Sequence, residues 1–122
     1  MTQEQIDLLL KDLCAKLPYG VKISVNDKIE TLQGINILDN VVEYGGFLSS
    51  DITEVKPYLL PISSMTAEQK REYVQIANKC STIASSQLAG MTIQDWFDKN
   101  HLDHRGFIPT GLAEDATNLN IY

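Results

Sequence analysis

Both histidines of this chain lie within four positions of each other, at His101 and His104, with Asp103 between them. Imidazole and carboxylate groups are ligands for divalent metals such as zinc, and a histidine beside an acid can also serve as a general base. A closed metal site needs a third or fourth ligand from elsewhere in the chain. The spacing therefore permits metal binding or acid–base catalysis without specifying either one.

A structural interpretation of the same segment is favoured. Asp103 and Arg105 can order a turn after a helix, through carboxylate bonds to backbone amides and a guanidinium that reaches a helix-end carbonyl or an acid such as Asp98. We therefore treat four residues as a candidate functional or loop-ordering cluster: His101, Asp103, His104 and Arg105. We assign no catalytic, cofactor-binding or metal-ligating residue, since the sequence lacks G-x-G-x-x-G, Walker, G-x-S-x-G and C-x-x-C motifs.

Helices on both sides of a strand-rich region must position this cluster. Apolar residues at helical spacing predict an amphipathic helix over residues 2–17, which Pro18 ends. The capping-box pattern from Thr66 to Gln69 predicts a second helix that could continue to Gly90. A shorter helix is predicted over residues 92–100, immediately before the cluster.

Between the helices, short strands alternate with turn residues. Alternating or short apolar runs predict four strands, at residues 21–25, 29–38, 41–48 and 52–55, with a bulge or bend at Gly34 and a turn at residues 49–51. Two prolines make residues 56–61 an extended connector rather than a central strand. We expect one buried face to be shared by the following residues: Leu9, Leu13, Val21, Ile23, Val25, Ile35 and Ile37.

These elements predict an α+β fold over a single globular domain, residues 1–122. An N-terminal helix leads into a small, bent antiparallel sheet that could curl into an open barrel, and two C-terminal helices pack on it. The length of 122 residues suits one domain.

Charge and cysteine usage restrict the environment and the partners. Ten basic and sixteen acidic residues give a net charge of −6, with no basic block, which argues against nucleic acid and anionic membrane surfaces as partners. Neither a signal peptide nor an apolar run near the ~18 residues of a membrane span is present, so we expect a cytoplasmic protein. Cys14 and Cys80 are expected to be buried, reduced and unpaired.

Three blocks of the sequence resemble a family of short uncharacterised proteins from Bacteroidetes genomes and their phages and prophages. The blocks are residues 12–21, residues 56–66, and residues 95–113 around Asp95-Trp96, Arg105-Gly106 and Gly111-Leu112-Ala113. The family commonly has an arginine where this chain has Leu60 and a tyrosine where it has His104, and tyrosine would be a poor substitute for a zinc ligand. The resemblance implies a mobile-element accessory role and no mechanism.

The sequence therefore favours a non-enzymatic protein–protein interaction module within phage or prophage biology, in a bacterial or phage-infected host cell. Its acidic surface would suit a basic protein partner, although the charge could equally serve solubility. One alternative is a small hydrolase or metal-dependent enzyme centred on residues 101–105. A second alternative is a component of a virion or of its assembly.

Overall fold

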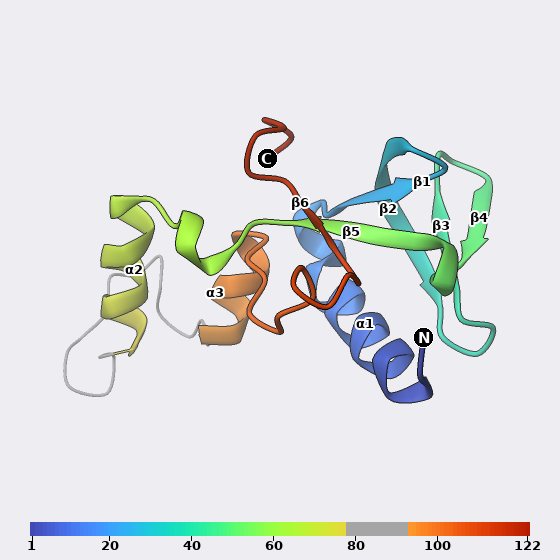
Figure 1. Ribbon diagram of the computed structural model, residues 1–122, viewed down its shortest axis with the longest axis horizontal. Coiled ribbons are helices and arrows are strands. Elements are labelled where there is room, and N and C mark those ends of the chain that lie inside the picture. Colours follow the sequence, from blue (N-terminus) through green and yellow to red (C-terminus); the bar gives the residue numbers. More distant parts are fainter. Residues whose placement is uncertain (78–92) are drawn as a thin grey trace.

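The computed structural model describes residues 1–77 and 93–122 (Figure 1). Within this part of the chain, the N-terminal helix α1 (Gln3–Lys16) packs against a mostly antiparallel sheet, and helices α2 (Ala67–Ala77) and α3 (Ile93–Lys99) follow. The fold is α+β, as predicted. No helix in these residues is long and apolar enough to cross a membrane.

Helix α1 begins and ends as its sequence predicts. The Thr2 hydroxyl accepts a hydrogen bond from the Gln5 amide, and the Gln5 side chain accepts one from the Thr2 amide, which forms a capping box. The helix ends at Lys16, and Pro18 then lies in a short 3₁₀ turn. Gly20 follows with φ 72°, a left-handed conformation that glycine adopts without strain.

The buried face of α1 differs from the predicted one. Leu9, Leu10 and Leu13 are buried as expected, but Asp12 and Lys16 are buried with them. The buried face is therefore rotated away from Cys14, which is exposed, so the prediction of a buried Cys14 is wrong. The predicted burial of Cys80, like the predicted continuation of the second helix to Gly90, lies outside the described residues.

The sheet has strand order β4-β3-β2-β1-β5-β6, and it is open rather than closed into a barrel. All of its pairs are antiparallel except β5 with β6. The strands in chain order are β1 (Lys22–Val25), β2 (Lys28–Asn36), β3 (Val41–Tyr44), β4 (Leu48–Asp51), β5 (Val55–Leu59) and β6 (Glu114–Asp115). The predicted irregularity at Gly34 is confirmed, because the register between β2 and β3 shifts between Leu32 and Gly34.

Three local predictions for the sheet are wrong. Residues 49–51 belong to strand β4 rather than to a turn, because β3 supplies the hydrogen-bonding partners that their polar side chains did not indicate. The strand predicted at residues 52–55 is a 3₁₀ turn over Ile52–Glu54. Residues 55–59, predicted mainly as a connector, form strand β5 inside the sheet although they include Pro57. Within the described residues β6 pairs only with Tyr58 and Leu59, so the missing amide of Pro57 removes no hydrogen bond from that ladder.

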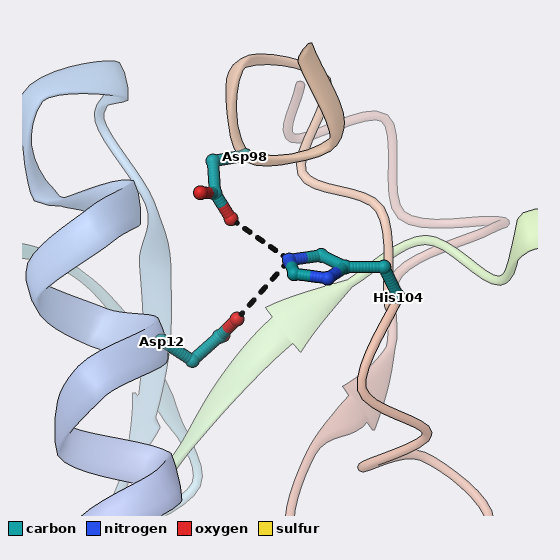
Figure 2. Close-up of side chains that lie close together, drawn as sticks. All are labelled: Asp12, Asp98 and His104. Carbon is teal, nitrogen blue, oxygen red and sulfur yellow. Dashed lines mark hydrogen bonds and ion pairs between the residues drawn. The ribbon is translucent and has the colours of Figure 1, made fainter. Parts of the chain in front are cut away.

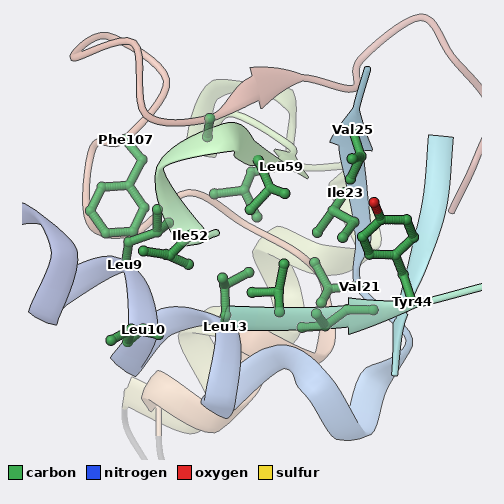
Figure 3. Packing of buried hydrophobic residues seen from close by; sticks show 14 residues of the cluster. Leu9, Leu10, Leu13, Val21, Ile23, Val25, Tyr44, Ile52, Leu59 and Phe107 are labelled. Atoms are coloured by element: carbon green, nitrogen blue, oxygen red, sulfur yellow. The ribbon is translucent and has the colours of Figure 1, made fainter. Parts of the chain in front are cut away.

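The main core lies between α1 and the sheet, where Leu9 and Leu13 meet Val21 and Ile23 (Figure 3). Val25 is also buried in it and Ile35 packs at its margin, both as predicted. Ile37 is 62% exposed, so its predicted burial is wrong: it follows the end of β2 and lies in the turn to β3.

A second cluster joins the C-terminal helices. Its buried members in the described residues are Ile76, Trp96 and Leu102. The predicted capping box of α2 is confirmed by reciprocal hydrogen bonds between Thr66 and Gln69. Helix α3 contacts α1 on one side and α2 on the other, so α2 lies at the end of the molecule opposite the hairpins of the sheet (Figure 1).

Candidate functional site

A buried cluster of charged side chains connects α1 to the C-terminal segment. Asp12 and Lys16 lie one turn apart on α1, and Asp98 lies on α3. The Lys16 ammonium hydrogen-bonds the Asp12 carboxylate and lies 2.9 Å from Asp98 Oδ1. All three side chains are almost completely excluded from solvent, and Lys16 is fully buried. Such groups are stable in a protein interior only when their charges are paired.

The loop after α3 supplies two more members of this ion cluster. His104 Nε2 lies 3.1 Å from Asp98 Oδ1 and 3.8 Å from Asp12 Oδ1 (Figure 2). The His104 ring stacks on Phe97, with the ring centroids 5.2 Å apart. Arg105 Nε donates a hydrogen bond to Asp12 Oδ1 over 3.1 Å. The sequence predicts that Arg105 reaches a helix-end carbonyl or an acid such as Asp98, and the acid that it bonds is Asp12, which approaches from α1.

The electrostatics of the ion cluster favour the ionised form of Asp98. Burial raises the pKa of Asp98, but hydrogen bonds from His104 and Lys16, together with their charges, outweigh it and hold this pKa below its ordinary value. Asp12 Oδ1 accepts the hydrogen bonds of Lys16 and Arg105, whereas Asp12 Oδ2 is buried without a hydrogen-bond partner among the residues that the structure describes. Two carboxylates thus face a lysine, an arginine and a histidine.

The ion cluster contains the donor set of a metal site, because one ligand atom each from Asp12, Asp98 and His104 lies within 4.8 Å of the others. Two carboxylates and an imidazole suit zinc or a related divalent ion. However, the Lys16 ammonium is bonded to both carboxylates. Since this ammonium already pairs with both carboxylates from a fully buried position, a metal ion would have to displace it. The arrangement therefore favours a structural ion cluster.

His101 lies apart from the ion cluster. Its ring stacks on Tyr122 with the centroids 3.7 Å apart, and the Tyr122 hydroxyl donates to the Tyr58 carbonyl and accepts from the Lys22 amide. Burial, with the charges of Lys16 and Lys22 as smaller contributions, lowers the pKa of His101 to about 4. The Nδ1 atom of His101 is buried and has no hydrogen-bond partner within residues 1–77 and 93–122. A neutral His101 therefore anchors the C-terminal segment over the sheet.

Asp103 orders the loop that follows it. Its two carboxylate oxygens accept hydrogen bonds from the amides of Phe107 (2.7 Å) and Ile108 (2.9 Å), and these are bonds of the predicted kind. The Asp103 amide in turn donates to the Leu60 carbonyl, and the Leu60 amide donates to the His101 carbonyl. Leu60 and Leu102 thus form a short parallel bridge just beyond the end of β5. Because successive side chains of an extended chain point to opposite sides, neighbouring residues of the segment 101–105 contact different parts of the protein.

The four predicted residues thus do not assemble into one site. His104 and Arg105 join the ion cluster, Asp103 binds backbone amides, and His101 contacts Tyr122. The sequence interpretation missed Asp12 and Lys16, which are central to the cluster. Their spacing of four residues on a predicted helix was the available signal, since such pairs meet on one face.

A different feature stands at the far end of the sheet, where β3 and β4 form a hairpin. The Phe47 side chain in its turn is fully exposed, and the neighbouring Leu48 is 55% exposed. A hollow of about 370 Å³, here called the hairpin hollow, runs along β3 and β4. Its lining residues are Asn36, Asp39, Val41, Glu43, Gly46, Phe47, Leu48 and Ser49. Leu38, in the turn at the other end of β3, is 95% exposed.

This end of the molecule also carries most of the net charge. Residues 29–54 contain Glu30, Asp39, Glu43, Asp51 and Glu54 but no lysine, arginine or histidine. Their five negative charges compare with −6 for the whole chain. The hairpin hollow thus combines exposed apolar side chains with a strongly negative local field.

Comparison of the chain with models of known protein families, with curated proteins and with solved structures gives no significant match.

Proposed function

We propose that this chain is a non-enzymatic protein-interaction module that binds a basic protein segment at the hairpin hollow. The observation that carries the proposal is the full exposure of Phe47 beside Leu48, at the rim of a surface hollow. Exposed apolar side chains grouped at a concave surface are typical of protein interaction sites, and aromatic residues are enriched in the centres of such interfaces.

The charge distribution supports a basic partner. Glu43 and Asp39 line the hollow, and residues 29–54 carry no positive charge that would oppose a cation. Complementary charge increases the rate of association and discriminates against acidic proteins. We therefore expect a partner segment that combines lysine or arginine with apolar residues.

The enzyme alternative receives less support from the geometry. It required His101, Asp103 and His104 to act together, but Asp103 is committed to two backbone amides and His101 to the ring of Tyr122. His104 lies within the ion cluster, where Lys16 pairs with both carboxylates. These contacts stabilise the fold and leave no shared reacting position for the three side chains.

The resemblance to short proteins of Bacteroidetes genomes and their phages supports a role in phage or prophage biology. A partner there could belong to the host or to the phage. A component of a virion or of its assembly would differ from such a module in one measurable respect, because it would bind further copies of itself or other particle proteins.

The test is affinity capture from extracts of host cells with three forms of the protein. These are the wild type, the double variant Phe47→Ser/Leu48→Ser, and the control variant Val74→Ser. Val74 is 53% exposed on α2, at the other end of the molecule. The proposal expects a basic protein to be retained by the wild type and by Val74→Ser but lost with the double variant. Retention that is equal for all three forms, or that is confined to acidic proteins, would contradict it.

A further inference from the structure

We propose that the basic segment binds as an additional β-strand along the outer edge of β4. This inference rests on the proposed function and specifies how the hairpin hollow recognises its partner. In such binding, backbone hydrogen bonds supply affinity and alternate side chains supply specificity.

The outer edge of β4 has backbone groups available for pairing. Strand β4 stands first in the strand order, and within the described residues it pairs only with β3. The Ile52 amide donates to the Asn40 carbonyl, so this pair is a hydrogen-bonded one. Hydrogen-bonded and non-hydrogen-bonded pairs alternate along antiparallel strands. The register of β3 with β4 then directs the amide and carbonyl of Ser50 toward β3 and those of Ser49 away from it.

The sequence of β4 contains neither the lysine nor the proline that commonly blocks strand addition at an edge. Edge strands are usually protected by lysine, proline or a covering element, whereas β4 reads Leu-Ser-Ser-Asp. The opposite edge of the sheet is formed by β6, which has only two residues. Among the described strands, β4 is therefore the edge better suited to accept a partner.

The two faces of β4 predict the side chains of the incoming strand. Leu48 and Ser50 lie on the core side, since they pair with Tyr44 and Val42, and the Tyr44 hydroxyl lies 2.7 Å from Ser50 Oγ. Ser49 pairs with Glu43 on the opposite face, which borders the hollow. A strand beside β4 would thus present apolar residues next to Leu48 and, at alternate positions, basic residues next to Ser49 on the face that carries Glu43.

The charge of this edge also selects against a second copy of the chain. Edge-to-edge pairing of two β4 strands would bring together the residues 29–54 of both copies, each with five acidic residues and no basic one. Like charges in adjacent strands are destabilising. A foreign basic strand gains from the same charges, so it is the occupant that the surface favours.

The experiment measures binding of a fluorescein-labelled peptide with four Lys-Val repeats by fluorescence anisotropy at low salt. Two control peptides accompany it, one with Glu in place of Lys and one N-methylated at alternate backbone amides. The protein variants are Ser49→Pro, which removes the outward amide, and Ser49→Ala, which keeps it. We expect Ser49→Pro or N-methylation to weaken binding by about tenfold or more, whereas Ser49→Ala has little effect.

Amide hydrogen exchange gives a second readout that does not depend on the fold of the variants. In the wild-type protein the Ser49 amide should exchange faster than the Ser50 amide, and the Lys-Val peptide should slow the exchange at Ser49. An unchanged rate at Ser49 in a saturated complex would overturn the strand-addition model.

The failures of the two proposals are distinguishable. Binding of the Lys-Val peptide that is reduced by Phe47→Ser/Leu48→Ser but unaffected by Ser49→Pro and by N-methylation would overturn strand addition and leave the proposed function standing. Equal binding of the Glu-Val and Lys-Val peptides, or binding of neither, would contradict both. A molecular mass that rises with protein concentration, and that Ser49→Pro returns to the monomer value, would indicate dimerisation through β4. This result would also overturn the proposal that a foreign basic strand binds at this edge.

Discussion

The ammonium of Lys16 lies 2.9 Å from the carboxylate of Asp98, although 82 positions separate the two residues in the sequence. Lys16 ends α1 and Asp98 lies near the end of α3, so this ion pair joins the N-terminal helix to the C-terminal segment. Because both side chains are excluded from water, the pair contributes to holding the helices in one relative position rather than to a solvated surface.

Removal of the Lys16 charge should strongly destabilise the protein. Lys16→Met retains much of the side-chain volume but leaves Asp12 and Asp98 without their shared cation, so we expect a loss of about 3–5 kcal/mol in the free energy of unfolding. Urea denaturation followed by circular dichroism measures this loss. Lys11→Met is the matched control, since Lys11 is exposed on the same helix and should change stability little. Equal effects of the two substitutions would contradict the role of the ion cluster.

Zinc should distinguish the wild type from a variant in which the ammonium is absent. In the wild type, Lys16 bonds both carboxylates, so neither EDTA nor added zinc should shift the Tm. Lys16→Ala frees Asp12, Asp98 and His104, whose ligand atoms lie within 4.8 Å of one another. Its Tm should rise with zinc concentration as bound metal stabilises the folded state. Zinc stabilisation of the wild type that is lost with His104→Ala would instead indicate a native metal site.

Asp103 should matter for stability rather than for chemistry. Asp103→Ala leaves the amides of Phe107 and Ile108 without their carboxylate acceptor, and we expect a loss of roughly 2–3 kcal/mol. Thermal unfolding without metal measures this change. Glu114→Ala is the control, because Glu114 makes only an exposed ion pair with Lys56 at 3.8 Å. A Tm for Asp103→Ala that matches this control would mean that the loop does not depend on the carboxylate.

His101 should make stability depend on mildly acidic pH. Its pKa is lowered from 6.5 to about 4, mainly by burial. Between these two pH values the unfolded chain binds a proton at His101 that the folded chain does not. The contribution of neutral His101 to the free energy of unfolding is therefore complete above pH 6.5 and is lost as the pH falls toward 4. His101→Asn removes the titration, and asparagine tolerates the φ of 57° at this position. Urea unfolding should therefore show a smaller loss of stability from pH 7 to pH 4 for His101→Asn than for the wild type, and equal losses would contradict the assignment.

The same substitution at two isoleucines should separate the core from the hairpin turn. Ile23 is fully buried in β1, so Ile23→Ala should cost about 2–5 kcal/mol. Ile37 is 62% exposed, so Ile37→Ala should cost much less, on the order of 0.5 kcal/mol. Chemical denaturation of the two variants measures both values. A cost at Ile37 comparable to that at Ile23 would place the turn in the core.

Features that depend on neighbouring residues could be predicted from the chain alone. The capping box at Thr66, the end of the first helix before Pro18 and the irregularity at Gly34 all appear where expected. Each depends on a backbone preference or on hydrogen bonds within a few residues. The acidic character of residues 29–54 is likewise readable directly, because a count of charges needs no coordinates.

The ion cluster and the course of β5 depend on contacts between distant segments. From the sequence, Asp12 and Lys16 are expected to be solvated residues of a helix. In the structure they are buried, because Asp98 and Arg105 from the C-terminal part of the chain pair with their charges. From the sequence, Pro57 is expected to lie outside a sheet. In the structure it lies in β5, because the short strand β6 pairs with Tyr58 and Leu59 and does not require an amide at Pro57. Whether a charged side chain is buried, and whether a strand tolerates proline, depends on the segment that packs or pairs with it in the folded protein. The residues next to it in the sequence do not identify that segment.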